Sequence, residues 1–184
     1  YTNDHFGEVI WAKEFAPTAN IRDRYYFSDA KKTEFSIFSK ATYKVGEQLT
    51  VYVDLQGRFI QYKTDGLTSK RAAIDVDENF RFFNPKLGVT YTVNPQNSLY
   101  FSFARANKEP KRNDFKNGIN THESLNDFEL GWRLKNENIK INTNVYYMSY
   151  QNQLVLTGAI NDVGSPVRAT SGKSYRLGVE VDAD

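Results

Sequence analysis

The stretch Asn84–Pro110 reads NPKLGVTYTVNPQNSLYFSFARANKEP, and its apolar residues recur at every second position. The alternation holds from Leu87 to Val93 and again from Leu99 to Phe103, on either side of a short polar turn. Because successive side chains of a β-strand leave opposite faces, each run predicts a strand with one apolar face. Two alternatives are open: a soluble β-sandwich, in which that face packs against a core, and a membrane barrel, in which it faces lipid.

Length and composition limit the classes of protein to which this chain can belong. Its 184 residues suffice for one domain, or at most two, with a core. The 24 basic and 22 acidic residues give a net charge of +2, and no nucleic-acid partner is indicated. Cysteine is absent, which excludes disulfides and cysteine-zinc sites. No run of about 18 apolar residues occurs, so a membrane-spanning helix is excluded, whereas alternating barrel strands are not.

Seven segments have the pattern of β-strands, each rich in aromatic or β-branched residues, and helical periodicity is nowhere convincing. We predict strands at residues 33–44, 49–63, 80–93, 98–107, 127–135, 139–157 and 174–182. Tight turns are predicted at 45–48, 94–97 and 136–138, where Gly, Asn and Pro occur. Long polar connections are predicted at 64–79, 108–126 and 158–173.

The strict alternation of short turns with long connections favours the barrel. An outer-membrane barrel places its short turns on the periplasmic side and its long loops outside, whereas a sandwich mixes hairpins with cross-sheet connections. We therefore predict an all-β fold, an antiparallel up-and-down meander of about seven strands that is part of a transmembrane β-barrel. Residues 1–32 would then form most of an extracellular loop.

The two faces of the predicted strands differ in polarity, as Val51 and Val53 alternating with Tyr52 and Asp54 illustrate. The second and sixth predicted strands exceed both the usual 3–10 residues of globular strands and the roughly 9–11 that cross a bilayer, which fits strands that project beyond a membrane. The apolar residues expected to share one face are Val51, Val53, Leu87, Val89, Leu99, Phe101, Leu130, Trp132, Ile141, Leu177 and Val179.

Several motifs, in their order along the chain, resemble the barrel of TonB-dependent outer-membrane receptors. They are NPKLG at Asn84–Gly88, an aromatic strand that leads to Glu109-Pro110, ELG at Glu129–Gly131, an N-x-x-x-Y-x-x-x-Y strand over Asn142–Tyr150, and YRLGVE at Tyr175–Glu180. The resemblance covers about half of the chain strongly and the first 80 residues more loosely. It is greatest to receptors of Bacteroidetes-type bacteria.

The resemblance implies active import of a scarce nutrient, most of all an iron chelate, across the cell outer membrane. In that family a barrel of about 22 strands is closed by a plug domain and driven by the TonB complex. We expect residues 1–184 to be a partial barrel segment without the plug domain or the C-terminal strand. Its partners would be the plug of the same receptor, the TonB complex through missing regions, outer-membrane lipid and lipopolysaccharide, and the nutrient. A passive porin-like barrel and a soluble β-sheet binding or adhesion module remain as alternatives.

Residues with catalytic or metal-binding chemistry are sparse. The only histidines, His5 and His122, lack a serine or carboxylate at motif spacing, and both are interpreted as solvated loop residues. The acidic cluster of Asp75, Asp77 and Glu78 lacks the spacing and the distal Glu of a calcium loop. We therefore expect neither enzymatic activity nor a cofactor nor a metal site.

Charged residues on the polar face carry more information. We predict that opposite charges pair across neighbouring strands there. A basic stretch, formed by Arg105, Lys108, Lys111 and Arg112, ends a strand on the predicted extracellular side and is the candidate substrate-binding site for an anionic ligand such as a ferric chelate. The alternative is a cationic rim that pairs with lipopolysaccharide phosphates. The residues expected in cross-strand pairs are Asp54, Arg58, Arg105, Glu129, Arg133, Arg176 and Glu180.

Overall fold

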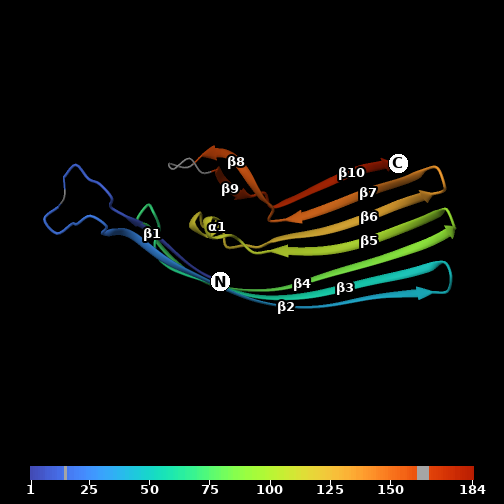
Figure 1. Ribbon diagram of the computed structural model, residues 1–184, viewed down its shortest axis with the longest axis horizontal. Helices are drawn as coiled ribbons and strands as arrows, with labels where there is room; N and C mark the ends of the chain where they lie inside the picture. Colours follow the sequence, from blue (N-terminus) through green and yellow to red (C-terminus); the bar gives the residue numbers. More distant parts are fainter. Residues whose placement is uncertain (15, 161–165) are drawn as a thin grey trace. The chain divides into compact units, whose positions relative to one another are not determined.

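A computed structural model describes residues 1–14, 16–160 and 166–184 and shows ten strands and one short helix in those ranges (Figure 1). The chain divides into two compact units. The first unit comprises Tyr1–Phe35 and Arg58–Arg81, and the second comprises Ser36–Gly57 and Phe82–Asp184. The elements are β1 (Thr2–Glu8), β2 (Arg24–Val45), β3 (Leu49–Leu67), β4 (Ala73–Asn94), β5 (Asn97–Lys108), α1 (Arg112–Lys116), β6 (Glu123–Lys135), β7 (Lys140–Gln151), β8 (Leu154–Ile160), β9 (Pro166–Thr170) and β10 (Lys173–Ala183).

Eight of these strands form one sheet in the order β1-β2-β3-β4-β5-β6-β7-β10, and β8 and β9 pair as a separate hairpin. The pairings of β1 with β2, β4 with β5, β5 with β6, β6 with β7 and β7 with β10 are all antiparallel, as in an up-and-down meander. The turns that join β2 to β3, β4 to β5 and β6 to β7 lie at the same end of the second unit (Figure 1). The predicted fold class and the common end of the three tight turns are confirmed.

Apolar side chains of the second unit form continuous rows across its strands. Val89 of β4 lies opposite Phe101 of β5, which lies opposite Leu130 of β6; Val145 of β7 and Val179 of β10 continue the row. These side chains are exposed, from 39% for Val89 to 65% for Val179. A second row lies two residues further along each strand, on the same face. It contains Phe103, Phe128 and Tyr147, whose successive ring centroids are 5.0 and 6.4 Å apart.

The predicted sharing of faces is confirmed. The registers place the named residues of β4, β5, β6, β7 and β10 on one face, because all of them alternate in phase with these rows. On β3, the Cβ of Tyr52 would lie 3.7 Å from a Cβ added at Gly88, so Tyr52 shares the polar face of Gly88. The side chains of Val51 and Val53, the neighbours of Tyr52, therefore project from the apolar face.

Tyrosine rings cover glycines on the polar face. Tyr100 lies opposite Gly131 and Tyr146 opposite Gly178 in the ladder. A Cβ built at Gly131 would approach Cε1 of Tyr100 to 2.1 Å, and one at Gly178 would approach the Tyr146 hydroxyl to 2.5 Å. The rings therefore occupy space that any larger residue would need, an arrangement that compensates for the missing glycine side chain.

The first unit has a different interior, with buried apolar side chains. Ile60 is 2% exposed and Ile74 is 6% exposed. The hydroxyl of Thr64, itself 2% exposed, donates a 2.6 Å hydrogen bond to the carbonyl oxygen of Asp29. Gly66 has a φ of 117°, and a Cβ there would meet the carbonyl oxygen of Phe27 at 2.4 Å, so close backbone approach requires glycine.

Several sequence-based boundaries are wrong at the ends of strands. Residues 1–32 were expected to be loop, but β1 pairs with the beginning of β2 from Thr2↔Lys31 to Glu8↔Arg24. Neither β1 nor this part of β2 has strict apolar alternation, so the sequence pattern did not indicate these strands. Backbone pairing can hold a strand that has no apolar face. The connection predicted at 64–79 is shorter, because β3 continues to Leu67 and β4 begins at Ala73.

The long predicted strand 139–157 is two strands. β7 ends at Gln151, and Asn152 has a φ of 55°, a left-handed conformation that Asn tolerates and that breaks the ladder. β8 begins at Leu154 and pairs with β9, from Leu154↔Thr170 to Ile160↔Pro166. Part of the predicted connection 158–173, residues 161–165, lies outside the described residues. Helix α1, which periodicity did not predict, lies within the predicted connection 108–126.

Candidate functional site

The connection between β5 and β6 contains helix α1, which is held by a buried carboxylate. Asp114 is 2% exposed, and its Oδ2 accepts a 2.8 Å hydrogen bond from the backbone N–H of Lys111, the residue that precedes the helix. The carbonyl oxygen of Asp114 accepts a 2.9 Å hydrogen bond from the N–H of Ile119, and Phe115 is buried. An acidic residue at this position satisfies an N–H that the helix leaves unpaired. The connection is therefore an ordered platform.

A network of buried polar side chains underlies this connection and ties four strands together. Nδ2 of Asn84 donates to Oε1 of Gln56 at 3.1 Å, and Oδ1 of Asn84 accepts from Nδ2 of Asn107 at 2.8 Å. The hydroxyl of Ser124 donates to Oδ1 of Asn107 at 2.7 Å. Asn84, Asn107 and Ser124 are each less than one-tenth exposed. Because buried amides are costly to leave unpaired, this network fixes the strand ends from which the connection emerges.

The four basic residues predicted as a substrate site lie on three successive structural features. Arg105 is within β5, Lys108 is its last residue, Lys111 is the N-cap of α1, and Arg112 is the first helical residue. All but Arg112, which is half-buried, are exposed. Arg105 and Lys108 are three residues apart in one strand, so their side chains leave opposite faces. Lys108, Lys111 and Arg112 remain as the candidate site, which we call the basic edge. Their role in binding stays a prediction.

Lys116, the last residue of helix α1, is a further cation near these residues that was not singled out from the sequence. It follows Arg112 by four residues, a spacing that brings two side chains to the same side of a helix. Burial lowers the pKa of Lys116, and the positive charge of Arg112 lowers it further. The spacing of four residues would have indicated this pairing had the helix been predicted.

The polar-face charges pair in part as expected. Nζ of Lys40 lies 3.5 Å from Oδ2 of Asp54, and the Tyr52 hydroxyl donates to the same oxygen at 3.0 Å. In the first unit, Nη2 of Arg58 lies 2.8 Å from Oε1 of Glu34.

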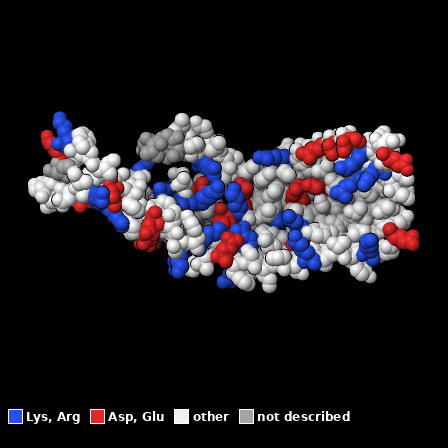
Figure 2. All heavy atoms as spheres, viewed as in Figure 1, with Lys and Arg blue, Asp and Glu red and all other residues white. Residues whose placement is uncertain are grey.

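Two other arginines contact aromatic rings, with Arg133 over Tyr100 at 4.2 Å and Arg176 over Tyr150 at 5.3 Å. Figure 2 shows basic and acidic side chains in neighbouring clusters on the face in view.

Two kinds of feature are absent from the described residues. Within residues 1–14, 16–160 and 166–184, no group of three or more His, Asp or Glu side chains is arranged to hold a metal ion. No helix in this part of the chain has the length and apolar character needed to cross a membrane.

The fold and the apolar rows agree with the comparison to known protein families. The model of the family "TonB dependent receptor-like, beta-barrel" matches residues 2–184. The chain belongs to this family, whose members are outer-membrane receptors, and the resemblance seen in the sequence is confirmed. The particular likeness to receptors of Bacteroidetes-type bacteria is not tested by this match. No curated protein matches the sequence.

Solved structures share the same architecture at low sequence identity. The ferric-catecholate import receptor Fiu from E. coli K12 matches 99% of this chain with a TM-score of 0.67 and 14% identity. The siderophore receptor PiuA from Acinetobacter baumannii matches 89% with a TM-score of 0.64 and 17% identity. The copper transporter OprC matches 88% with a TM-score of 0.67 and 13% identity. These likenesses establish the fold, and the chain spans only 30%, 24% and 27% of the three matched chains, respectively.

Proposed function

We propose that this chain is a partial segment of the barrel wall of an outer-membrane receptor that imports an iron chelate with energy from the TonB complex. The supporting observation is the uncovered apolar face of the second unit. Burying one Leu, Phe or Val side chain contributes about 1.5–3 kcal/mol, so a face with many such residues exposed to water is unfavourable. Lipid covers such a face in a barrel, and the family match agrees with that environment.

The iron chelate is the finer part of the proposal. Fiu and PiuA are described as receptors for ferric catecholates and siderophores, whereas OprC is described as a copper transporter. The fold is therefore compatible with more than one cargo. The basic edge of Lys108, Lys111 and Arg112, carried by an ordered platform, favours an anionic ligand because exposed cations attract it from solution. Contact of the same residues with lipopolysaccharide phosphates is the competing role.

The partners and the absence of enzymatic activity are also proposed here. In the intact receptor the polar face would enclose the lumen, and a plug domain of the same receptor would fill it. Energy would reach that plug through the TonB complex. The chain would act as a wall and a binding surface with no chemical step of its own.

Growth under iron limitation tests the proposal. The full receptor gene would be expressed in a strain without its own ferric-chelate receptors, with and without a functional TonB complex. We expect growth on at least one ferric chelate that depends on both the receptor and TonB. Uptake that persists without TonB would instead support a passive barrel. A cooperative unfolding transition of the isolated, monomeric chain in buffer without detergent would support the soluble-module alternative.

A further inference from the structure

Glu123, the first residue of β6, lies between two partners for its carboxylate. In the ladder it is directly opposite Lys108, the last residue of β5 and a member of the basic edge. Its Oε2 accepts a 2.9 Å hydrogen bond from the backbone N–H of Leu154, the first residue of β8. The basic edge and the β8–β9 hairpin therefore meet at this one half-buried side chain.

The position of Glu123 would allow an ion pair with Lys108. Residues directly opposite in an antiparallel ladder project from the same face, with Cβ atoms roughly 4.5–5.5 Å apart, so this pair needs no movement of the backbone. Within residues 1–14, 16–160 and 166–184, however, the ammonium of Lys108 is in no ion pair. The carboxylate is instead directed to Leu154, and the exposed Lys108 keeps its charge for other partners.

The N–H of Leu154 is not needed inside the hairpin. Leu154 is opposite Thr170 in the β8–β9 ladder, but its N–H points to Glu123, as alternate N–H groups of an antiparallel strand point away from the partner strand. A carboxylate acceptor makes this hydrogen bond stronger than one between neutral groups. A longer contact, from Nδ2 of Asn152 to the carbonyl oxygen of His122 at 3.4 Å, joins the same two segments.

The base of the hairpin is fixed separately. The N–H of Asn152 donates to the carbonyl oxygen of Gly172 at 2.6 Å, and the N–H of Ser171 donates to the carbonyl oxygen of Gln153 at 2.8 Å. Beyond this base, β8 and β9 form a two-stranded sheet of their own (Figure 1). A two-stranded hairpin is only marginally stable in water. The hairpin can therefore leave Glu123 without any change in the eight-stranded sheet.

We propose that docking of the β8–β9 hairpin on Glu123 regulates the positive charge of the basic edge. While the N–H of Leu154 holds the carboxylate, Lys108 is available to an anionic ligand. When the hairpin leaves, the carboxylate pairs with Lys108 and compensates its charge. This inference rests on the proposed function, because that function gives the basic edge a ligand.

Ligand binding and hairpin docking favour each other in this arrangement. An anion on Lys108 removes the competitor of Leu154 for Glu123, and a docked hairpin removes the competitor of the anion for Lys108. Such coupling is reciprocal by thermodynamic necessity. An exposed ion pair changes an equilibrium by at most about fivefold, so the hairpin adjusts the charge of the edge by a moderate factor.

Acetylation of lysines in the full receptor tests this inference. Two reagents would be compared, the anionic sulfo-N-hydroxysuccinimide acetate and its uncharged analogue, and each lysine would be followed by peptide mass spectrometry. The ratio of the two rates reports the positive charge near a given lysine, because the reactivity of the amine itself enters both rates. Lys13, exposed in the first unit, is the reference lysine.

Variants at Leu154 separate the N–H from the side chain. Leu154→Pro removes the N–H at the first residue of a strand, where proline is tolerated, and Leu154→Ala retains it as the matched control. We expect the ratio at Lys108 to fall by about two- to fivefold in the proline variant only, and the ratio at Lys13 to stay unchanged. In a Glu123→Gln background the proline should have no effect, because no carboxylate remains to pair with Lys108.

Hydrogen exchange with an unaltered hairpin gives a second measurement. Lys108→Gln removes the competitor for the carboxylate, so the amide of Leu154 should exchange about two- to fivefold more slowly than in the parent. Lys111→Gln, which changes a residue of the basic edge that is not opposite Glu123, is the control. It should leave the exchange rate unchanged.

The following results would overturn the inference. A ratio at Lys108 that is unaffected by Leu154→Pro, or that falls equally in the Glu123→Gln background, would show that the hairpin does not act through the carboxylate. Exchange at Leu154 that is unaffected by Lys108→Gln would show that the two partners do not compete. Neither measurement involves uptake, so any of these results together with TonB-dependent growth would leave the proposed function standing. Growth without TonB would contradict that function independently.

Discussion

The two units of this chain arrange apolar residues in opposite ways. The first unit buries Ala30, Ile60, Ile74 and Phe80. In the second unit, by contrast, the buried apolar side chains among the described residues are those of Phe82, Pro110 and Phe115, and the rows through Phe101 and Leu130 are exposed. The difference teaches that one chain can combine a small apolar interior with a sheet whose apolar face stays uncovered.

Both units also bury polar residues, among them Ser28 and Thr64 in the first unit. The second unit buries Asp54, Asn84, Asn107 and Ser124, each with a hydrogen-bond partner. A soluble sheet would place its apolar face inward and leave these groups in water. The second unit is stabilised by backbone ladders and by polar contacts, and no described residue covers its apolar face.

The largest expected effect is at the buried core of the first unit. Ile60→Ala in the full receptor should reduce the free energy of unfolding by about 2–5 kcal/mol, because it removes packed methyl groups and leaves a cavity. Leu177→Ala, on the apolar face that lipid would cover, is the control and should cost less because lipid can fill the space that the side chain leaves. Denaturant unfolding of the receptor in lipid vesicles measures both. Equal losses would remove the distinction between the two units.

A charge on the proposed lipid face should have the next largest effect. Val53→Arg should reduce stability by about 2–4 kcal/mol in lipid vesicles, because the guanidinium would enter hydrocarbon near the middle of the membrane. Asp54→Asn, at the adjacent residue on the other face, should cost much less. The same unfolding measurement compares them. Equal effects of the two changes would contradict a lipid-facing assignment for Val53.

The polar network of the second unit should contribute at an intermediate level. Asn107→Ala removes partners from Asn84 and Ser124 and should cost about 1–3 kcal/mol, the range for leaving buried polar groups unpaired. Asn113→Ala, at an exposed residue of the nearby helix, is a suitable control. Hydrogen exchange of the β5–β6 connection should also become faster in the first variant only. Unchanged exchange would mean that the network does not hold this connection.

The smallest effect on stability is expected at the basic edge, where Lys108 and Lys111 are exposed and Arg112 is half-buried. Replacing Lys108, Lys111 and Arg112 together by Ser should change the free energy of unfolding by no more than about 0.5 kcal/mol and leave surface expression unchanged. Affinity for the ferric chelate should fall, and the difference from the parent should narrow as salt is raised, because screening weakens a charge-driven site. An affinity equal to that of the parent at low and high salt would assign these residues to a solvated rim.

Sequence patterns predicted the alternating strands and tight turns of the second unit better than β1 and the end of β7. Turns such as 94–97 and the alternation of Leu87 to Val93 are local signals, since a strand with one apolar face needs no distant information to be recognised. β1 was missed because its pairing with β2 is made by backbone groups that any sequence supplies. The break at Asn152 was missed because one left-handed residue interrupts an otherwise continuous β-like pattern.

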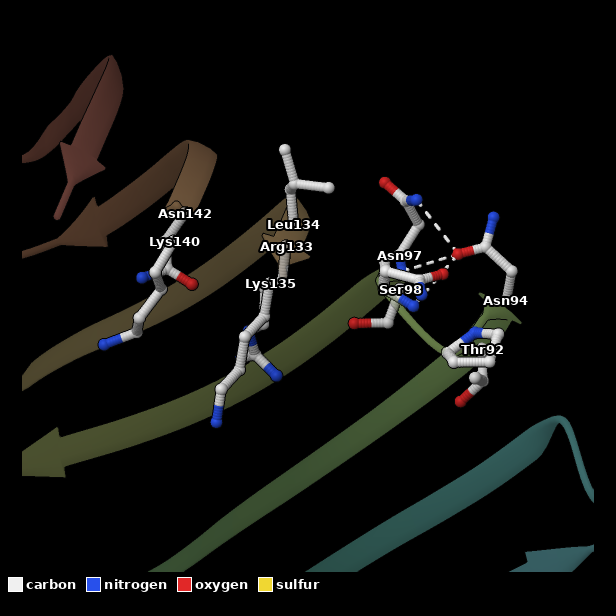
Figure 3. A pocket seen from close by; sticks show the side chains of 11 residues that line it. Thr92, Asn94, Asn97, Ser98, Arg133, Leu134, Lys135, Lys140 and Asn142 are labelled. Carbon is white, nitrogen blue, oxygen red and sulfur yellow. Dashed lines mark hydrogen bonds between the residues drawn. The ribbon is translucent and has the colours of Figure 1, made fainter. Parts of the chain in front are cut away.

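The candidate sites show the same division. The basic residues from Lys108 to Arg112 could be identified as a local excess of charge, but their separation from Arg105 could be seen only with the strand register. The network through Asn107 joins residues from four strands, and a pocket of about 320 Å³ at the turn end is lined by residues of the β4–β5 and β6–β7 hairpins (Figure 3). Neither leaves a signature at fixed spacing, because its members come together only after the strands have paired.

By itself, the sequence determined the strand period, the tight turns, the family and which face of each strand is apolar, because all of these depend on neighbours within a few residues. Only the tertiary structure decided which side chains lie opposite each other, such as Lys135 and Lys140, and which polar groups are buried, such as Asn84 and Asn107. The physical reason is that cross-strand contacts depend on register, and register is set by the whole sheet and its turns. The same dependence places Lys135 and Asp184 on either side of Lys140 at the turn end of the sheet.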